Sequence, residues 1–205
     1  MLKIQTVNLF LATIIPLCFV PAPDNTLIFI QSTFQGRKAG LALTLGVCTG
    51  FTFHVMAVVA GLAVVIQTSV SLFNCLKIIG AGYLLYLAWQ AFNLRFELDA
   101  MDNDSGTFFT SYRRGFLINF LNPMNPLFLL VLLPQFVKPE QGAANGQLIQ
   151  LGLLAAVSLL IIFGLFSLVG DKVGRKIIHL DGFQTIIRYV SSITIGVLAI
   201  VLIFQ

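Results

Sequence analysis

Six apolar segments run along the chain, separated by polar connections. They cover residues 7–33, 40–66, 70–93, 114–137, 146–169 and 184–204. Because an α-helix rises about 1.5 Å per residue, each segment is long enough to cross the roughly 30 Å of hydrocarbon in a bilayer. The pattern therefore predicts six transmembrane helices in a single domain over residues 1–205. A polar linker over 94–112 separates its halves, 1–93 and 113–205.

The composition assigns these segments to a membrane rather than to a soluble core. Hydrophobic residues make up 58% of the chain and charged residues only 10%, with a mean hydropathy of +0.94. Soluble domains carry about 25% charged residues, so we expect an all-α integral membrane protein. Lys3 and the apolar run after it resemble a signal peptide, but apolar sequence resumes after Asp24. The first span is therefore expected to remain uncleaved.

The first apolar segment is interrupted by Pro21-Ala22-Pro23-Asp24-Asn25. Proline lacks an amide hydrogen and obstructs the preceding helical turn, so the first span is predicted to be a broken helix. Within a membrane, such a break persists only where protein or an aqueous cavity satisfies the released backbone groups. Asp24 adds an ionisable group at this depth, which indicates a functional site. The alternative is a structural kink in which Asp24 caps the following helix.

The fourth apolar segment contains a similar interruption, Asn122-Pro123-Met124-Asn125-Pro126. Three spans per half place the second half in the membrane in the opposite sense to the first, as in transporters built from two inverted three-helix repeats. Helix rise places Asp24 about 18 Å from Gly36 and Pro123 about 13 Å from Arg114. Both breaks are therefore expected near the middle of the membrane, where they can form one site.

Lysine and arginine predict the orientation, because cytoplasmic connections attract them. Nine of the twelve lie in or beside the first, third and fifth connections: Arg37, Lys38, Arg95, Arg113, Arg114, Lys172, Arg175, Lys176 and Arg188. The other side has Lys3, Lys77 and Lys138. Both termini are thus predicted to face outward. Since the basic residues act as topology signals, we expect no nucleic-acid partner.

Small residues on the second span favour close helix packing. Gly36 and Gly40 are four residues apart, and so are Gly46 and Gly50. Small side chains allow membrane helices to approach each other closely. We therefore expect the second span to pack against the first.

The side chains near the breaks suit a zwitterionic substrate without requiring one. Asp24 can bind a substrate ammonium group or carry a coupling proton, and the sequence leaves both roles open. Amides at the helix starts after Pro23 or Pro126 can bind a carboxylate. His54, near the centre of the second span, can join proton transfer or be a neutral side chain bonded to a backbone carbonyl or a hydroxyl. Neutral hydrogen-bonding groups come from Asn25, Asn122 and Asn125.

Longer motifs extend over nearly the whole chain. They are Gly36-Arg37-Lys38-Ala39-Gly40, Lys77, Gly80-Ala81-Gly82-Tyr83-Leu84-Leu85-Tyr86-Leu87, Arg114-Gly115-Phe116-Leu117-Ile118-Asn119-Phe120-Leu121-Asn122-Pro123 and Leu133-Pro134-Gln135-Phe136-Val137. With the broken first span, they resemble the LysE/RhtB family of amino-acid exporters. The resemblance implies proton-driven export of amino acids or close derivatives across a bacterial inner membrane, with no enzymatic reaction and no cofactor. Two residues depart from the usual family pattern, since Ala22 replaces a glycine and Met124 replaces a lysine. The loss of that lysine removes a cation that the resemblance implies beside the site, so the family's substrate preference is not carried over.

Other functions stay open on the sequence alone. A metal-ion or other small-solute exporter of the same superfamily would use Asp24 and the asparagines as oxygen ligands, but one carboxylate is a poor site for a divalent ion. A membrane thiol-redox protein would use Cys18, Cys48 and Cys75, which form no Cys-x-x-Cys pair and suit small buried hydrophobes better. A non-transporting assembly protein leaves the paired breaks unexplained. Lipids, protons and the substrate are the expected partners, and a homo-oligomer is compatible with the sequence.

Overall fold

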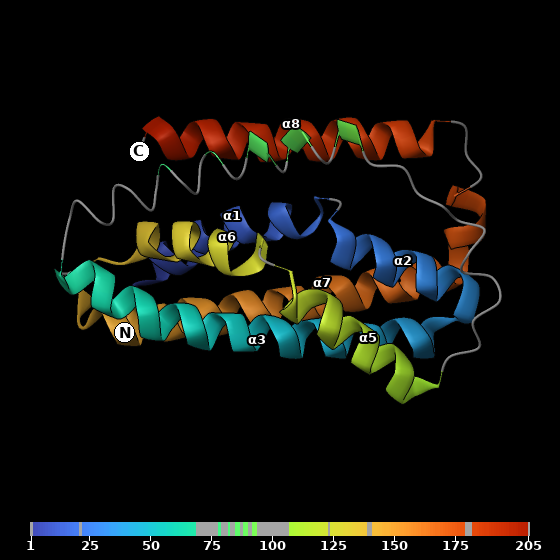
Figure 1. Ribbon diagram of the computed structural model, residues 1–205, viewed down its shortest axis with the longest axis horizontal. Coiled ribbons are helices and arrows are strands. Elements are labelled where there is room, and N and C mark those ends of the chain that lie inside the picture. The colour runs from blue at the N-terminus through green and yellow to red at the C-terminus, as the bar shows by residue number, and fades with distance from the viewer. Residues whose placement is uncertain are drawn as a thin grey trace.

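The computed structural model describes residues 2–20, 22–68, 78, 82, 85–86, 88–89, 92–93, 107–122, 124–138, 141–178 and 182–204. Every regular element that it describes is helical, which confirms the all-α class (Figure 1). The elements are α1 (Ile4–Cys18), α2 (Pro23–Gln35), α3 (Arg37–Thr68), α5 (Phe108–Phe120), α6 (Met124–Leu132), the 3-10 helix η2 (Leu133–Phe136), α7 (Ala144–Ile178) and α8 (Phe183–Phe204).

Helices break at both predicted interruptions. The first break separates α1 from α2, and the second separates α5 from α6. Pro23 begins α2, where a missing amide hydrogen has no intrahelical acceptor and the fixed φ of proline suits a helix. Pro126 lies in the first turn of α6 for the same reason. Pro21 and Pro123 lie outside the described residues.

The two broken helices run in opposite directions. Figure 1 shows α1, α2 and α7 running one way along the molecule, and α3, α5, α6 and α8 running the other way. Within the described residues, the stretches Arg37–Gly61 and Ala144–Gly174 are long and apolar enough to cross a membrane, and Ile4–Cys18 is a shorter apolar helix. The third expected span, 70–93, lies mainly outside the described residues. The six-span count and the inverted repeat therefore stay predictions.

The second half of the chain becomes helical earlier than its hydropathy indicates. The linker was expected over 94–112, but α5 begins at Phe108. Thr107 supplies the start, because its hydroxyl accepts a hydrogen bond of 3.3 Å from Thr110 N and satisfies an amide of the first turn. Residues 94–106 lie outside the described residues.

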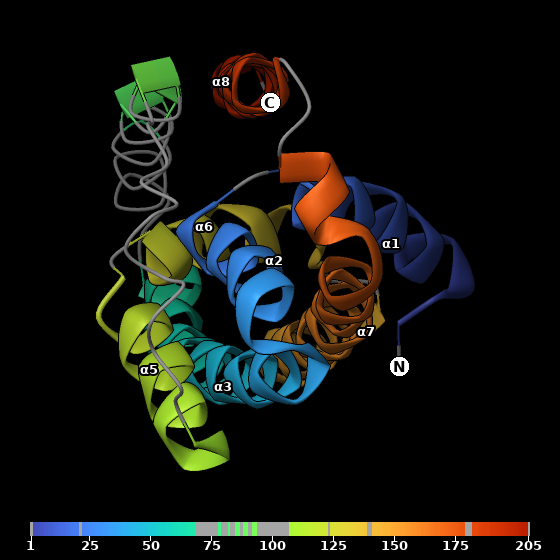
Figure 2. The same ribbon diagram turned by 90° about the vertical axis from the view of Figure 1, so that its right-hand side faces the viewer.

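Helix α3 packs on α2, α5 and α7 (Figure 2). Glycine makes these contacts close. A Cβ on Gly40 would overlap Ser32 of α2, which agrees with the expected packing on the first span. A Cβ on Gly46 would instead overlap Tyr112 O, and one on Gly50 would lie 3.0 Å from Asn119 Oδ1. The second span therefore packs on the first, as expected, through Gly40, while Gly46 and Gly50 face α5.

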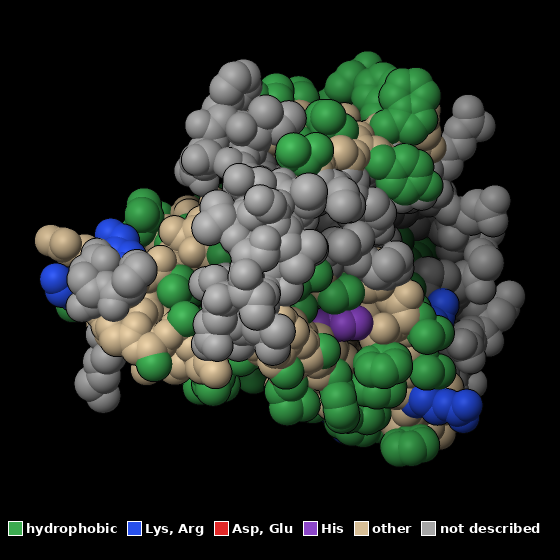
Figure 3. Space-filling view, turned by 60° about the vertical axis from the view of Figure 1, so that its left-hand side comes forward, with side chains coloured by type: hydrophobic (Ala, Val, Ile, Leu, Met, Phe, Trp, Pro, Cys, Tyr) green, Lys and Arg blue, Asp and Glu red, His purple; other side chains and the backbone are tan. Residues whose placement is uncertain are grey.

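The outer surface is strongly apolar. Side chains such as Phe53 and Met56 on α3, Leu153 on α7 and Ile193 on α8 are exposed. Among the coloured side chains in Figure 3, hydrophobic ones predominate and lysine and arginine lie toward the edges. Exposed apolar surface of this extent is typical of contact with lipid. It is therefore compatible with a helical bundle inside a membrane.

Helix α8 lies outside the bundle that the other labelled helices form (Figure 2). Its main described helix contact is with α7. It also contacts the segment before the linker, because Arg188 Nε donates a hydrogen bond of 2.6 Å to Phe92 O. The guanidinium carbon lies 5.5 Å from the centre of the Phe92 ring, a cation–π arrangement.

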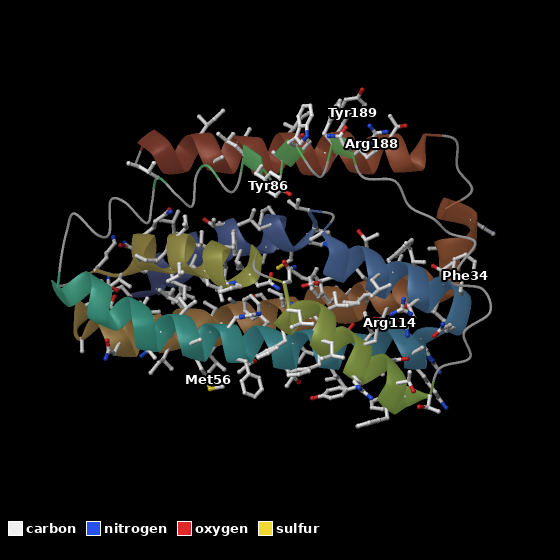
Figure 4. The ribbon with its side chains drawn as sticks, viewed as in Figure 1. Phe34, Met56, Tyr86, Arg114, Arg188 and Tyr189 are labelled. Atoms are coloured by element: carbon white, nitrogen blue, oxygen red, sulfur yellow. The ribbon has the colours of Figure 1, made fainter. Side chains whose placement is uncertain are left out.

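One end of the bundle collects basic residues, and we call it the basic end. Here Gly36 turns the chain from α2 into α3 with a φ of 83°, and Arg37 N donates a hydrogen bond of 3.1 Å to Asp171 Oδ1 of α7. Figure 4 shows Phe34 and Arg114 toward this end and Met56 on the outside of α3 away from it. The residues that define the basic end are Arg37, Lys38, Arg113, Arg114, Lys172 and Lys176.

Candidate functional site

The first break is held together by Asn25. Its Oδ1 accepts a hydrogen bond of 2.7 Å from Ala22 N, and its Nδ2 donates to Cys18 O at 3.0 Å and to Val20 O at 2.6 Å. These are backbone groups that the prolines prevent from pairing within a helix. Asn25 was expected along a substrate or proton pathway. The structure places its amide on the backbone of the break itself.

Asp24 points toward the second break. Its Oδ2 accepts a hydrogen bond of 2.6 Å from Asn119 Nδ2 and a longer one of 3.3 Å from Asn125 Nδ2. Asn122 adds a weaker interaction with the same carboxylate. Asp24 is only 5% exposed and Asn119 is fully buried. The two breaks, far apart in the sequence, therefore meet at one buried carboxylate.

The described side chains that donate hydrogen bonds to Asp24 are polar and uncharged. All its described hydrogen-bond partners are neutral amides. Asp24 also lies in the first turn of α2, and α6 begins with Met124 and Asn125, so two helix N-termini lie beside the carboxylate. Helix N-termini favour a negative charge. Asp24 Oδ1 nevertheless has no hydrogen-bond partner among the described residues, which leaves one carboxylate oxygen available to a proton or a cation.

His54 contacts this site through Asn119. Its Nε2 lies 3.0 Å from Asn119 O, and because a backbone carbonyl only accepts, Nε2 carries the hydrogen. The imidazole also stacks on Phe120, with ring centres 5.9 Å apart and an interplanar angle of 18°. His54 is half-buried. The structure thus joins His54 to the residue that binds Asp24.

Asn119 is the site residue that sequence reasoning missed. It sits in the apolar run before the second break and is one member of a series with four-residue spacing, Ser111, Gly115 and Asn119. Residues four apart share one face of a helix, and all three are buried. A face of small and polar residues within an apolar helix was the signal that could have identified Asn119.

Two of the three cysteines lie near the first break or on the second span. Cys18 is buried and Cys48 is half-buried, and both are free thiols. Cys18 belongs to the main hydrophobic core and Cys48 packs against it. Cys75 lies outside the described residues.

Comparisons with known proteins find membrane proteins and efflux proteins among the relatives of this chain. The chain is 32% identical to an uncharacterized membrane protein, YrhP, of Bacillus subtilis over 85% of this chain and 87% of that protein. It is 29% identical to the homoserine/homoserine lactone efflux protein of Salmonella typhi over 72% of this chain and 70% of that protein. It is also 29% identical to an uncharacterized membrane protein, YahN, of Escherichia coli over 61% of this chain and 56% of that protein.

No solved structure is significantly similar to the chain. The model of the LysE type translocator family, however, matches residues 15–205, which includes both helix breaks and every residue named at the site. Together with the apolar helices and the relatives that are membrane proteins, this match identifies a multi-pass membrane protein of a family of transporters. The chain belongs to the LysE type translocator family.

Proposed function

We propose that this protein exports an amino acid or a close derivative across a bacterial inner membrane. Efflux is coupled to proton entry by alternating access, and both termini face the periplasm. The family match and the efflux relatives support the direction and the substrate class. Homoserine is the first compound to test, because two of these relatives are homoserine/homoserine lactone efflux proteins.

The buried Asp24 carboxylate at the junction of the two breaks carries this proposal. Its Oδ2 is bound by asparagine amides, while its Oδ1 makes no hydrogen bond to any described residue. A substrate ammonium group can donate to Oδ1. The substrate carboxylate can then accept hydrogen bonds from the amides that begin α6, where the helix dipole favours an anion.

The same carboxylate provides a way to couple substrate to protons. A charged side chain in the middle of a membrane costs at least about 2.5–3.5 kcal/mol, which corresponds to a roughly hundredfold effect on population. The site therefore switches readily between its inward-facing and outward-facing states only when the charge of Asp24 is neutralised. An ammonium group neutralises it on the outward step and a proton neutralises it on the return step. Because the ammonium group and the proton bind the same Asp24 oxygen in turn, export of a substrate is coupled to entry of a proton.

The neighbouring residues position Asp24 in this scheme. Asn119 and Asn125 hold Oδ2, so that Oδ1 faces the ligand. Asn25 stabilises the break that aims Asp24 at them, because it binds the freed backbone groups. His54 donates to Asn119 O and thereby restrains the end of α5.

Efflux of labelled homoserine from loaded cells tests the proposal, followed by a panel of labelled amino acids. Asp24→Asn keeps the size and the hydrogen-bonding capacity of the side chain but removes the charge. We expect this variant to reach the membrane at normal abundance and to lose efflux at least about tenfold. Asp171→Asn is the matched control, because it changes an exposed carboxylate at the basic end that accepts from Arg37 N. Full efflux by Asp24→Asn across the panel contradicts the proposal.

Proton coupling has its own readout in proteoliposomes that contain a pH-sensitive dye. Addition of an exported amino acid on one side is expected to move protons in the opposite direction through the wild-type protein and not through Asp24→Asn. Substrate transport without proton movement would be compatible with substrate binding at Asp24 and would contradict proton coupling.

A further inference from the structure

A second set of polar side chains extends from Asp24 toward the basic end, along the boundary between α2 and α5. Gln31 and Gln35 follow Asp24 on one face of α2, because their spacing corresponds to about two and three helical turns. On α5, Ser111 precedes Asn119 by about two turns. The two helices run in opposite directions, so Asp24 meets Asn119 while Gln31 Nε2 donates a hydrogen bond of 2.8 Å to Ser111 Oγ. We call these five residues the α2–α5 seam.

The seam contains all the buried side-chain polar atoms that lack a hydrogen-bond partner in the described part of the chain. They are Asp24 Oδ1, Gln31 Oε1, Gln35 Oε1, Gln35 Nε2 and Asn119 Oδ1. Buried polar atoms are normally paired, so each unpaired one requires an explanation. Polar atoms left over by imperfect packing would be scattered over the fold. Their concentration along one boundary indicates that a polar ligand or water pairs with them in another state.

The packing around α5 allows this boundary to open. Helix α5 lies tightly on α3, since Gly46 abuts Tyr112 O and Gly115 abuts Leu43 O. Its contacts with α2 are sparse in comparison (Figure 2). Separation of α2 from α5 therefore leaves the close α3–α5 contacts intact. In the closed arrangement, fully buried Ile28 lies on the seam face of α2 between Asp24 and Gln31.

We propose that the α2–α5 seam is the passage through which substrate moves between the basic end and Asp24. The Gln31–Ser111 hydrogen bond and the Ile28 side chain close it in this structure. This inference rests on the proposed function. The passage is lined by neutral amides and a hydroxyl, which can donate to a carboxylate and accept from an ammonium group. Such a lining suits a small zwitterion, because it hydrogen-bonds both ends without holding either by a full opposite charge.

A reversible crosslink across the seam tests this proposal. Gln31→Cys and Ser111→Cys are combined in a background in which Cys18, Cys48 and Cys75 are replaced and efflux is retained. A short bifunctional thiosulfonate reagent then joins the two helices through disulfides. We expect efflux of labelled homoserine, or of the panel amino acid that the wild type exports, to fall at least tenfold on crosslinking and to return after reduction.

The matched control is Thr44→Cys with Ser167→Cys, which joins α3 to α7 where the two hydroxyls are 3.1 Å apart. Its crosslink is expected to leave efflux within about twofold.

A second measurement applies even if the double substitution itself impairs efflux. Gln35→Cys alone is treated with a small, membrane-permeable thiol reagent, with Gln135→Cys on η2 as an exposed control. Modification at position 35 is expected to block efflux, and saturating substrate is expected to slow it. Full efflux with the seam locked, or with position 35 modified, overturns the passage. If Asp24→Asn still abolishes efflux in that case, the proposed function stands and only the passage is wrong. Unchanged efflux with the seam crosslinked, with position 35 modified and in Asp24→Asn overturns both the passage and the proposed function.

Discussion

Asn119 Nδ2 donates a hydrogen bond of 2.6 Å to Asp24 Oδ2, and the two residues are 95 positions apart in the chain. The contact joins the helix that precedes the second break to the helix that follows the first. A hydrogen bond to a charged, buried acceptor contributes more than one between neutral groups. This pair therefore contributes the shortest of the described hydrogen bonds that join the two halves at the carboxylate on which the proposed transport depends.

The asparagines around Asp24 are expected to differ in importance according to their hydrogen-bond lengths. Asn119→Ala removes the short bond and is expected to lower efflux about tenfold to a hundredfold, the range for a bond to a charged group. Asn125→Ala removes the 3.3 Å bond and is expected to lower efflux only about twofold to fivefold. Initial efflux rates, normalised to membrane abundance, measure both effects. Asn145→Ala is the control, since Asn145 is exposed at the start of α7. A larger loss for Asn125 than for Asn119 would contradict the geometry.

His54 is expected to act as a positioning residue. His54→Gln retains a donor for Asn119 O but cannot titrate near neutral pH, so efflux and its pH profile are expected to stay close to those of the wild type. His54→Phe lacks the donor and is expected to lower efflux about fivefold, as for the loss of one neutral hydrogen bond. The measurement is efflux across a range of external pH. A pH profile that flattens in His54→Gln would show that the imidazole itself carries the proton.

Close contact between α3 and α5 makes one glycine intolerant of substitution. A Cβ on Gly115 would overlap Leu43 O, which belongs to a helix backbone and cannot rotate away. Gly115→Ala is expected to destabilise the protein by about 1–3 kcal/mol, the usual cost of overpacking. Gly164→Ala in α7 is the control, because a Cβ there meets nothing within 4 Å and alanine favours a helix by about 0.5–1 kcal/mol. Thermal unfolding in detergent measures both variants. Equal melting temperatures would rule out the close packing.

Cysteine labelling at the two ends of α7 can determine the orientation of the protein in the membrane. Lys172 lies at the basic end and Asn145 lies near the other end of the helix, and both are exposed. With the native cysteines replaced, Asn145→Cys is expected to react with an impermeant thiol reagent in whole cells. Lys172→Cys is expected to react only after the cells are opened, because basic connections face the cytoplasm. The reverse labelling pattern would invert the proposed orientation.

Features that depend on local chemistry were predictable from the sequence. Proline prevents helix continuation whatever surrounds it, so both breaks could be located from the residues alone. Counting helical rise from the basic connections also placed Asp24 and the second break at similar depth. The hydrogen bonds from Asn119 and Asn125 to Asp24 agree with that estimate.

Features that depend on which helix faces which were not predictable. Small residues indicate close packing but do not identify the partner, so the sequence could not show that Gly40 meets α2 while Gly46 meets Tyr112 of α5. Asp24 and Asn25 are adjacent polar residues in the sequence. Only the fold directs the amide of Asn25 to Cys18 O and Val20 O and the carboxylate of Asp24 to the opposite half.

Because residues of the first half contact residues of the second, these contacts can form only after the second half has been synthesised. Asp24 emerges from the ribosome 95 residues before Asn119, the donor of its shortest hydrogen bond. The contact of Thr6 with Gln141, at the other end of the first broken helix, spans 135 residues. The insertion machinery therefore receives a proline-broken, aspartate-bearing span whose stabilising partners do not yet exist. Until those partners arrive, we expect this span to be open to membrane quality control, so mutations in the second half that remove its partners are expected to lower the abundance of the whole protein in the membrane.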